Sequence, residues 1–126
     1  MAWNIATRRQ LADAAEVDVV VPAPGRPDTR TPIWIVAVDD DLYVRSWKGE
    51  AGIWYRRARR HGAGTVVAHG QQHQVQFTAT DDPGINARID EAYRIKYGNS
   101  SYTQTMTRPP ATSTTMRLDP ALPFIP

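Results

Sequence analysis

The sequence predicts a small β-rich α+β domain, a barrel of six or seven short strands with two or three short helices. Two observations favour this fold class. Short β-prone stretches alternate with turn residues along the chain, and one of them, Ile33–Val38, is apolar on both faces. Such a strand suits a barrel, because its inner face packs in the core while a helix or a second subunit covers its outer face.

Length and composition limit the classes of protein that fit. The 126 residues suit one domain, residues 1–126, in which 119–126 form a proline-rich tail that we expect to be extended. The absence of cysteine excludes disulfides, thiolate metal sites and a cysteine nucleophile. The start MAWNIATRRQ lacks a signal-peptide core, and no stretch approaches the ~20 apolar residues of a membrane span, so we expect a cytoplasmic protein without a membrane partner.

The first third of the chain predicts one helix and one strand. Thr7 and Gln10 have the spacing of a capping box, which predicts a helix over Thr7–Ala15. The β-branched run Val17–Val21 predicts a strand that ends at Pro22. Four prolines and a glycine between positions 22 and 32 predict an ordered loop.

A hairpin follows. On the strand Ile33–Val38, side-chain alternation places Ile33, Ile35 and Ala37 on one face and Trp34, Val36 and Val38 on the other. Asp39–Asp41 form the turn, and Leu42–Trp47 return as the second strand. On this strand Arg45 shares a face with Tyr43 and Trp47, so aromatic side chains flank it.

The central and C-terminal segments complete the prediction. Helices are expected at Ile53–His61, ended by Gly62, and at Gly84–Tyr97, which begins with Asp82 as N-cap and Pro83 and ends at Gly98. Further strands are expected at Thr65–His69, Gln74–Thr80, Tyr102–Met106 and Thr112–Leu118.

Arginines dominate the positive charge and gather in one helix, at Arg56, Arg57, Arg59 and Arg60. The planar guanidinium suits phosphate and carboxylate, so the cluster indicates either an anionic ligand or a solvated helix face. The net charge is only +2 and no nucleic-acid motif is present, so nucleic acid is not an expected partner. The three histidines have no metal-ligand spacing, and no metal is expected.

The helix that starts near Gly52 offers free backbone N–H groups and the positive end of its dipole. A phosphate at this position could also bond to Arg45, Ser46 and Arg56. In the alternative interpretation Arg45 pairs with a carboxylate such as Glu50. The aromatic residues Trp34, Trp47, Trp54 and Tyr55 could be walls for a flat ligand or part of the core.

Five ordered motifs resemble a known bacterial family. They are TPIWIVAV (31–38), LYVRS (42–46), WYRR (54–57), IDEAYRIKYG (89–98) and the closing segment Ala111–Pro120. This combination, which spans Trp3 to Pro120, resembles the family called domain of unknown function 2255. That family is similar to split-barrel flavin-binding proteins, which include pyridoxamine-phosphate oxidases and deazaflavin-dependent reductases.

The resemblance implies a split β-barrel, a role as an oxidoreductase and a cofactor, either FMN or a deazaflavin coenzyme. Trp54-Tyr55-Arg56 is similar to a run in the deazaflavin enzymes, although Arg57-Ala58 replaces the asparagine-leucine that often follows it. By order, Thr31 is the nearest counterpart of a strand arginine in the oxidases. The implied cofactor-binding residues are Thr31, Arg45, Ser46, Lys48, Trp54, Tyr55 and Arg56.

Two functional hypotheses stay open. In the first, the protein positions a flavin or deazaflavin beside a substrate. In the second, the protein is a cofactor-free ligand-binding protein or enzyme that holds an organic acid or a hydrophobic metabolite in the same groove. The expected partners are a small-molecule ligand and a second copy of the chain, in a homodimer that buries the outer face of Ile33–Val38.

Overall fold

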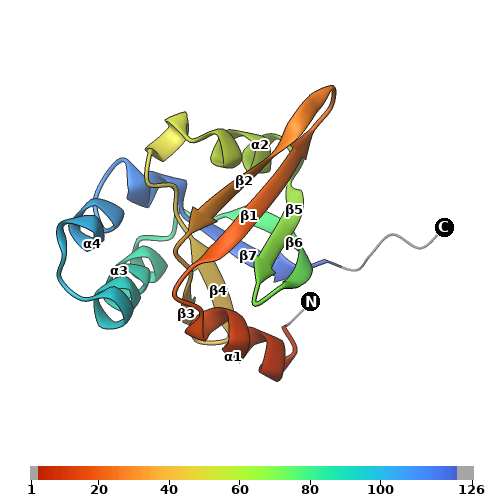
Figure 1. The fold of residues 1–126 in the computed structure, drawn as a ribbon. Coiled ribbons are helices and arrows are strands. Elements are labelled where there is room, and N and C mark those ends of the chain that lie inside the picture. The colour runs from red at the N-terminus through yellow and green to blue at the C-terminus, as the bar shows by residue number, and fades with distance from the viewer. Residues whose placement is uncertain (1–2, 122–126) are drawn as a thin grey trace.

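The computed structural model describes residues 3–121 and contains one seven-stranded antiparallel sheet, in the order β2-β1-β5-β6-β7-β4-β3 (Figure 1). The strands are β1 (Val17–Ala23), β2 (Arg26–Ile33), β3 (Val36–Val38), β4 (Asp41–Val44), β5 (Ala63–Ala68), β6 (Gln71–Ala79) and β7 (Met116–Pro120). The α-helices are α1 (Ile5–Asp13), α2 (Ile53–His61), α3 (Pro83–Tyr97) and α4 (Ser101–Met106), and the 3₁₀ helices are η1 (Gly49–Ala51) and η2 (Ala111–Thr114).

The connection between the two edges of the sheet shows that it is rolled up. Strands β2 and β3 lie at opposite edges, yet only Trp34 and Ile35 separate them in the chain. Three residue steps span at most about 11 Å, whereas seven flat strands would be about 29 Å across. The edges must therefore approach each other, and the protein is an α+β split β-barrel, as predicted.

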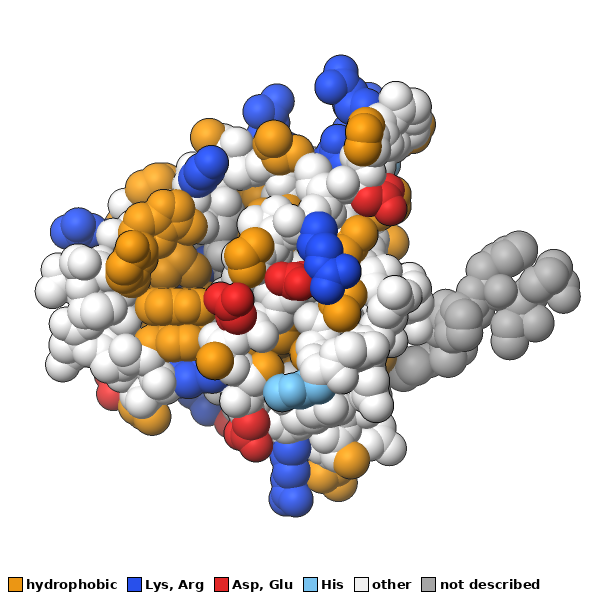
Figure 2. Space-filling view, in the orientation of Figure 1, with side chains coloured by type: hydrophobic (Ala, Val, Ile, Leu, Met, Phe, Trp, Pro, Cys, Tyr) orange, Lys and Arg blue, Asp and Glu red, His pale blue; other side chains and the backbone are white. Residues whose placement is uncertain are grey.

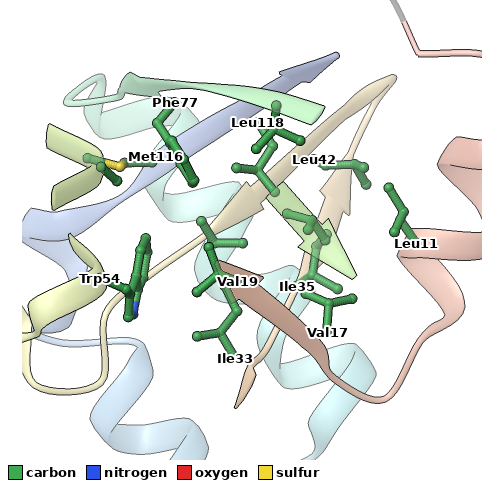
Figure 3. Close-up of a cluster of buried hydrophobic side chains, with 14 of the residues drawn as sticks. Leu11, Val17, Val19, Ile33, Ile35, Leu42, Trp54, Phe77, Met116 and Leu118 are labelled. Atoms are coloured by element: carbon green, nitrogen blue, oxygen red, sulfur yellow. The ribbon is translucent and has the colours of Figure 1, made fainter. Parts of the chain in front are cut away.

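The main hydrophobic core fills the inside of this barrel. Inward side chains such as Val19, Ile35 and Leu42 are fully buried there. Leu11 of α1 and Trp54 of α2 lie on opposite sides of the cluster, so a helix closes each end (Figure 3). The N-terminal segment is tied to the last strand by Trp3, whose indole N–H donates to the carbonyl of Leu118 at 2.8 Å.

A second apolar cluster lies outside the barrel. Val36, Val38 and Tyr43 pack there against Ile89 and Tyr93 of α3. The predicted division of the first hairpin strand into two apolar faces is confirmed, because Ile33 and Ile35 belong to the inner cluster. Since α3 covers the outer face, that face no longer argues for a homodimer, which stays a prediction.

Two helices begin and end as their capping residues predict. The carboxylate of Asp82 accepts a hydrogen bond from the N–H of Ile85 at the start of α3. Helix α2 ends at Gly62, which has the left-handed conformation expected of a C-terminal cap (φ 75°). Within residues 3–121, no helix is long and apolar enough to cross a bilayer.

Two predictions in the N-terminal third are wrong. Helix α1 begins earlier than predicted, because the side chain of Asn4 accepts from the N–H groups of Ala6 and Thr7 and caps the helix in place of Thr7. The proline-rich stretch is a strand, β2, and not a loop. It lies at the edge of the sheet, where proline removes no ladder bond on the open side, and Pro22 lies at an irregularity in the β1–β2 register.

The predicted strand Ile33–Val38 is interrupted at Trp34 and Ile35. The N–H of Ile35 donates to the Tyr97 hydroxyl at 3.3 Å, and its carbonyl accepts from Lys96 Nζ at 2.6 Å. Side chains of α3 thus take the place of ladder partners. The chain can therefore leave one edge of the sheet and join the other.

The C-terminal strands are only partly as predicted. Residues 102–106 lie in α4 and not in a strand, because Ser100 caps a helix whose Thr103 and Met106 are buried. The closing strand starts at Met116, after the 3₁₀ helix η2. Of the predicted tail, Asp119 and Pro120 belong to β7, and residues 122–126 lie outside the described part of the chain.

Candidate functional site

A groove of about 650 Å³ opens between the C-terminal end of β2, the turn that follows β4, the start of α2, and α4. Hydrophobic side chains gather on this face, between the side that carries α4 and the end of β2 (Figure 2). The lining residues are Glu16, Thr29, Arg30, Thr31, Pro32, Ile33, Trp34, Arg45, Ser46, Trp47, Lys48, Gly52, Ile53, Trp54, Tyr102 and Met106. The volume lies within the usual range for small-molecule sites.

The start of α2 forms a polar end of this groove. Gly52 is the N-cap residue, and no side chain of residues 3–121 caps the helix. The N–H of Arg56 is the first to bond within the helix, to the carbonyl of Gly52. The N–H groups of the first turn therefore lack intrahelical acceptors, and the helix dipole adds positive potential at this point.

Ser46 lies against this helix start. The residue is only 1% exposed, and its N–H donates to Thr114 Oγ1 at 2.8 Å. Its hydroxyl has no hydrogen-bond partner among residues 3–121. A Cβ atom added to Gly52 would lie 2.5 Å from Ser46 Oγ, so only glycine lets the hydroxyl approach the helix start this closely. Serine and helix together form a cradle of donors that suits an anion.

Aromatic side chains form much of the remaining wall. Trp34 lines the groove and stacks on Tyr97, with 3.8 Å between ring centroids and 3° between ring planes. Trp54 is nearly buried and packs against Phe77 in the core. Trp47 is more exposed and contacts Tyr102, at 5.0 Å between centroids. Flat, apolar walls of this kind suit a flat ligand.

Four charged side chains line the groove, and two of them, Arg30 and Arg45, already have carboxylate partners. The guanidinium of Arg30 bonds to Asp18 at 2.8 Å. Lys48 is exposed and has no ion pair with any residue of the described range 3–121. It is therefore the cation that a ligand can approach most freely.

Arg45 borders the groove, but its guanidinium points into the protein. It donates to Thr115 Oγ1 (2.8 Å), to Asp90 Oδ1 (2.5 Å), to the carbonyl of Met106 (2.9 Å), and to the carbonyl and side-chain oxygens of Asn86 (3.2 and 3.0 Å). These bonds use all five N–H donors of an arginine. The arrangement matches the structural alternative, with Asp90 as the carboxylate in place of Glu50, and it leaves no N–H for a ligand.

Burial shifts the acidity of three side chains behind the wall. It lowers the pKa of Lys96 to about 8, an effect that the nearby Asp13 carboxylate partly opposes. Burial also raises the pKa of Tyr97 to about 12 and that of Tyr93 further. Both tyrosines therefore stay neutral near neutral pH.

The structure brings five of the seven predicted site residues to the groove. Thr31, Arg45, Ser46, Lys48 and Trp54 line it. The other two do not. Tyr55 is buried in the core, where its hydroxyl accepts from Arg59, and the Arg56 side chain is exposed on α2 outside the lining.

Sequence reasoning missed several lining residues. Tyr102 lies in a segment for which the sequence predicts a strand, and no local signal indicates that it contacts Trp47. Arg30 lies in the segment predicted as a loop, and Glu16 lies between two predicted elements. Ile53 directly follows Gly52 at the predicted start of the helix, and this position is the one sequence signal that could have placed it at the groove.

The family model described as "Uncharacterized protein conserved in bacteria (DUF2255)" matches residues 8–118. No curated protein matches the chain. Among solved structures, one similar chain is a candidate pyridoxamine 5'-phosphate oxidase from Listeria innocua, with a TM-score of 0.66, 13% identity, and coverage of 93% of this chain and 92% of that one.

Two further solved structures have the same fold. An FAD-binding protein from Mesorhizobium loti has a TM-score of 0.58 and 13% identity, with coverage of 94% of this chain and 88% of that one. An F420 reductase has a TM-score of 0.56 and 12% identity, with coverage of 91% and 93%. At these identities the similarity shows the fold alone.

Proposed function

Because the chain belongs to the bacterial family described as DUF2255 and has the split-barrel fold, we propose that it is an oxidoreductase that binds a flavin or deazaflavin cofactor in its groove. The observation that carries the proposal is the combination of a donor cradle at the start of α2 with aromatic walls in one cavity. Flavin and deazaflavin coenzymes join a flat ring system to a phosphate, so they match both parts.

The residues present fit such a cofactor. The first-turn N–H groups of α2 and the unpaired hydroxyl of Ser46 would donate hydrogen bonds to the phosphate, and Lys48 would add a positive charge. Gly52 keeps this cradle open, because any larger residue would displace the serine hydroxyl. Arg45 would act indirectly, by fixing the turn that carries Ser46.

The ring system would lie against the aromatic wall. Trp34 is held by its stack on Tyr97, and Trp54 by the core, so both rings are fixed before a ligand arrives. A preorganised wall loses little side-chain entropy on binding. The bound cofactor would supply the hydride chemistry, and the protein would orient it and exclude water from one of its faces.

Three kinds of structure support this proposal by analogy. One neighbour is a candidate pyridoxamine 5'-phosphate oxidase, one is FAD-binding and one is an F420 reductase. The descriptions of the second and third structures name a flavin or deazaflavin cofactor, and the description of the first, an oxidase, is consistent with a flavin-related role. Which cofactor this chain takes is part of the proposal and is decided by titration.

A cofactor-free ligand-binding protein is the second candidate function. The favouring observation is that Arg45 has no N–H left for a phosphate. In this case the cradle would hold the carboxylate of an organic acid. Such an acid should raise the melting temperature of the protein by an amount that grows with the logarithm of its concentration relative to its Kd, while a flavin should not.

Fluorescence titration of the purified protein with FMN, FAD and a deazaflavin coenzyme tests the proposal. We expect one of the three compounds to bind. Gly52→Ala should weaken that binding at least tenfold, because an alanine Cβ would displace Ser46 Oγ. The variant should still fold, since the backbone angles of Gly52 (φ −63°, ψ 130°) suit alanine. Gly84→Ala, in the first turn of α3 and outside the groove lining, is the matched control. Absence of binding to all three compounds would overturn the proposal.

A further inference from the structure

The mouth of the groove carries an unusual concentration of exposed hydrophobic side chains. Five large hydrophobic residues are exposed among residues 3–121, and three of them, Trp47, Ile53 and Tyr102, line this one groove. Their exposed fractions are 45%, 59% and 59%. Exposed hydrophobic residues are ordinary when they are scattered, but a cluster at the edge of a cavity indicates a binding surface.

The fold brings the residues of this cluster together from distant parts of the sequence. Trp47 follows the buried Ser46, and Tyr102 lies in the first turn of α4, 55 positions later in the sequence. Their rings contact each other at 5.0 Å between centroids. The buried Arg45 connects the two sides, because it precedes Trp47 by two residues and donates to the Met106 carbonyl in α4 at 2.9 Å.

The mouth is distinct from the donor cradle deeper in the groove. Ser46, Gly52 and Trp54 are buried, whereas the three mouth residues stand at the surface. A ligand that fills the cradle and lies along Trp34 would therefore leave the outer rings available for a second compound. We name Trp47, Ile53 and Tyr102 the groove mouth.

The size of the groove mouth argues for a small occupant. At about 200 Å² for a large side chain, the exposed fractions correspond to roughly 300 Å² of apolar surface. A stable protein–protein interface needs about 800 Å² from each partner. The surface is sufficient for one face of a two-ring compound and is too small to hold a protein partner by itself.

The charges around the groove mouth specify the occupant further. Arg30 is neutralised by Asp18, and Lys48 belongs to the anion end. Arg45 is paired with Asp90 inside the protein, so Glu16 is the remaining charged residue in the lining, and it would repel an anion. Two rigid aromatic rings and an aliphatic side chain favour a flat compound without charge.

We propose that the groove mouth is a substrate subsite for a flat, uncharged aromatic or conjugated compound. The inference rests on the proposed function for the role of this compound as a redox substrate. The binding itself depends only on Trp47, Ile53 and Tyr102. A compound held there would lie in the same cavity as the proposed cofactor, so it could accept a hydride from the reduced cofactor and a proton from water, which would leave the cofactor oxidised.

Calorimetric titration with 2-naphthol tests the inference. We expect the wild-type protein to bind it, and Tyr102→Ala and Trp47→Leu each to weaken binding about tenfold, because each removes one aromatic contact. Both side chains are exposed, so the variants should fold. Ile95→Ala removes an exposed isoleucine on α3 outside the groove lining, and we expect no change in affinity. The saturated analogue 2-decalol should bind more weakly than 2-naphthol, because it lacks the flat aromatic rings.

The outcomes separate this inference from the proposed function. If no flavin or deazaflavin binds but the naphthol titrations behave as stated, the proposed function fails and the subsite stands. If the variants bind 2-naphthol as the wild type does, the subsite is overturned. It is also overturned if Tyr102→Ala weakens FMN or deazaflavin binding as strongly as naphthol binding, because the mouth would then be part of the cofactor site.

Discussion

Replacing Arg45 with methionine should destabilise the protein by about 3 kcal/mol. Removal of one partner from a buried ion pair typically costs ~3–5 kcal/mol, because the other charge is left without compensation. Here the change would remove the guanidinium donor from the carboxylate of Asp90 and from four further acceptors, of which Asn86 Oδ1 keeps the Thr115 hydroxyl as a donor. The Asp90 side chain is 22% exposed, so water can reach the freed carboxylate, and we expect the lower end of the range.

Thermal and urea unfolding measure this loss. For a domain of this size, ~3 kcal/mol corresponds to a melting temperature lower by roughly 12 °C. The double variant Arg45→Met/Asp90→Leu should be more stable than Arg45→Met alone, since it removes the unpaired carboxylate as well. Arg88→Met is a matched control, because Arg88 also bonds to a carboxylate, at 2.7 and 2.8 Å, but in an exposed pair, and it should leave the melting temperature nearly unchanged.

The refuting result is an Arg45→Met protein that melts within about 2 °C of the wild type. Such a result would mean that the internal bonds of Arg45 contribute little. If the same variant lost its flavin or deazaflavin affinity at full stability, Arg45 would be a ligand-binding residue after all. Unfolding and titration on one variant therefore decide between the two roles.

Three further predictions concern other parts of the molecule. Gly49→Ala should lower the free energy of unfolding, measured in urea, by ~1–3 kcal/mol, because Gly49 has φ 62° and a Cβ atom would lie 2.7 Å from Pro110 Cβ. The control Gly25→Ala has only the backbone strain (φ 70°) and should cost less. The unfolding free energy should rise between pH 8 and 10, because the pKa of Lys96 is about 8 in the fold and 10.5 in the unfolded chain, which holds that proton more tightly. The gain should be on the order of 1 kcal/mol after discounting for the solvent around this half-exposed group, and it should be absent in Lys96→Met. Above pH 10 the unfolding free energy should fall again, because Tyr97 ionises in the unfolded chain while its raised pKa keeps it neutral in the fold. The sequence predicts a homodimer, so light scattering should give twice the 14.1 kDa chain mass. A mass of 14.1 kDa at micromolar concentration would contradict that prediction.

Elements with strong local signals were predictable from the sequence. Asp82, Pro83 and Gly98 bracket α3 as observed, and the bounds of α2 agree residue by residue with the prediction. The alternation of Leu42 and Tyr43 between inner and outer clusters also followed from the period of a strand. In these places local preference and tertiary packing favour the same structure.

The errors occur where tertiary context overrides local preference. The prolines of β2 argue against a strand in general, but an edge strand tolerates them. The threonines of α4 favour a strand by propensity, yet the Ser100 cap and the burial of Met106 stabilise a helix. No local signal shows that Tyr97 and Lys96 would bond to the backbone of Ile35 from a helix 61 or 62 residues away.

The candidate site was predictable in its polar half only. Ser46 and the glycine-started α2 are neighbours in sequence, so their approach could be inferred. The groove mouth could not, because the contact between Tyr102 and Trp47 depends on the packing of α4 beside η2 and on its hydrogen bond from Arg45. Residues that meet across the fold leave little trace in local patterns.

The most direct test of the central claim compares the affinity of the protein for each cofactor and for its phosphate-free form. FMN is compared with riboflavin, and the deazaflavin coenzyme with its bare chromophore, on the wild-type protein and on Ser46→Ala. If the cradle at the start of α2 holds the phosphate, the wild type should bind one phosphorylated form at least tenfold more tightly than its counterpart. Ser46→Ala should reduce that preference severalfold, while Ser113→Ala, an exposed serine outside the groove lining, should not. Equal affinity for the two forms, or a preference that Ser46→Ala leaves intact, would contradict the account.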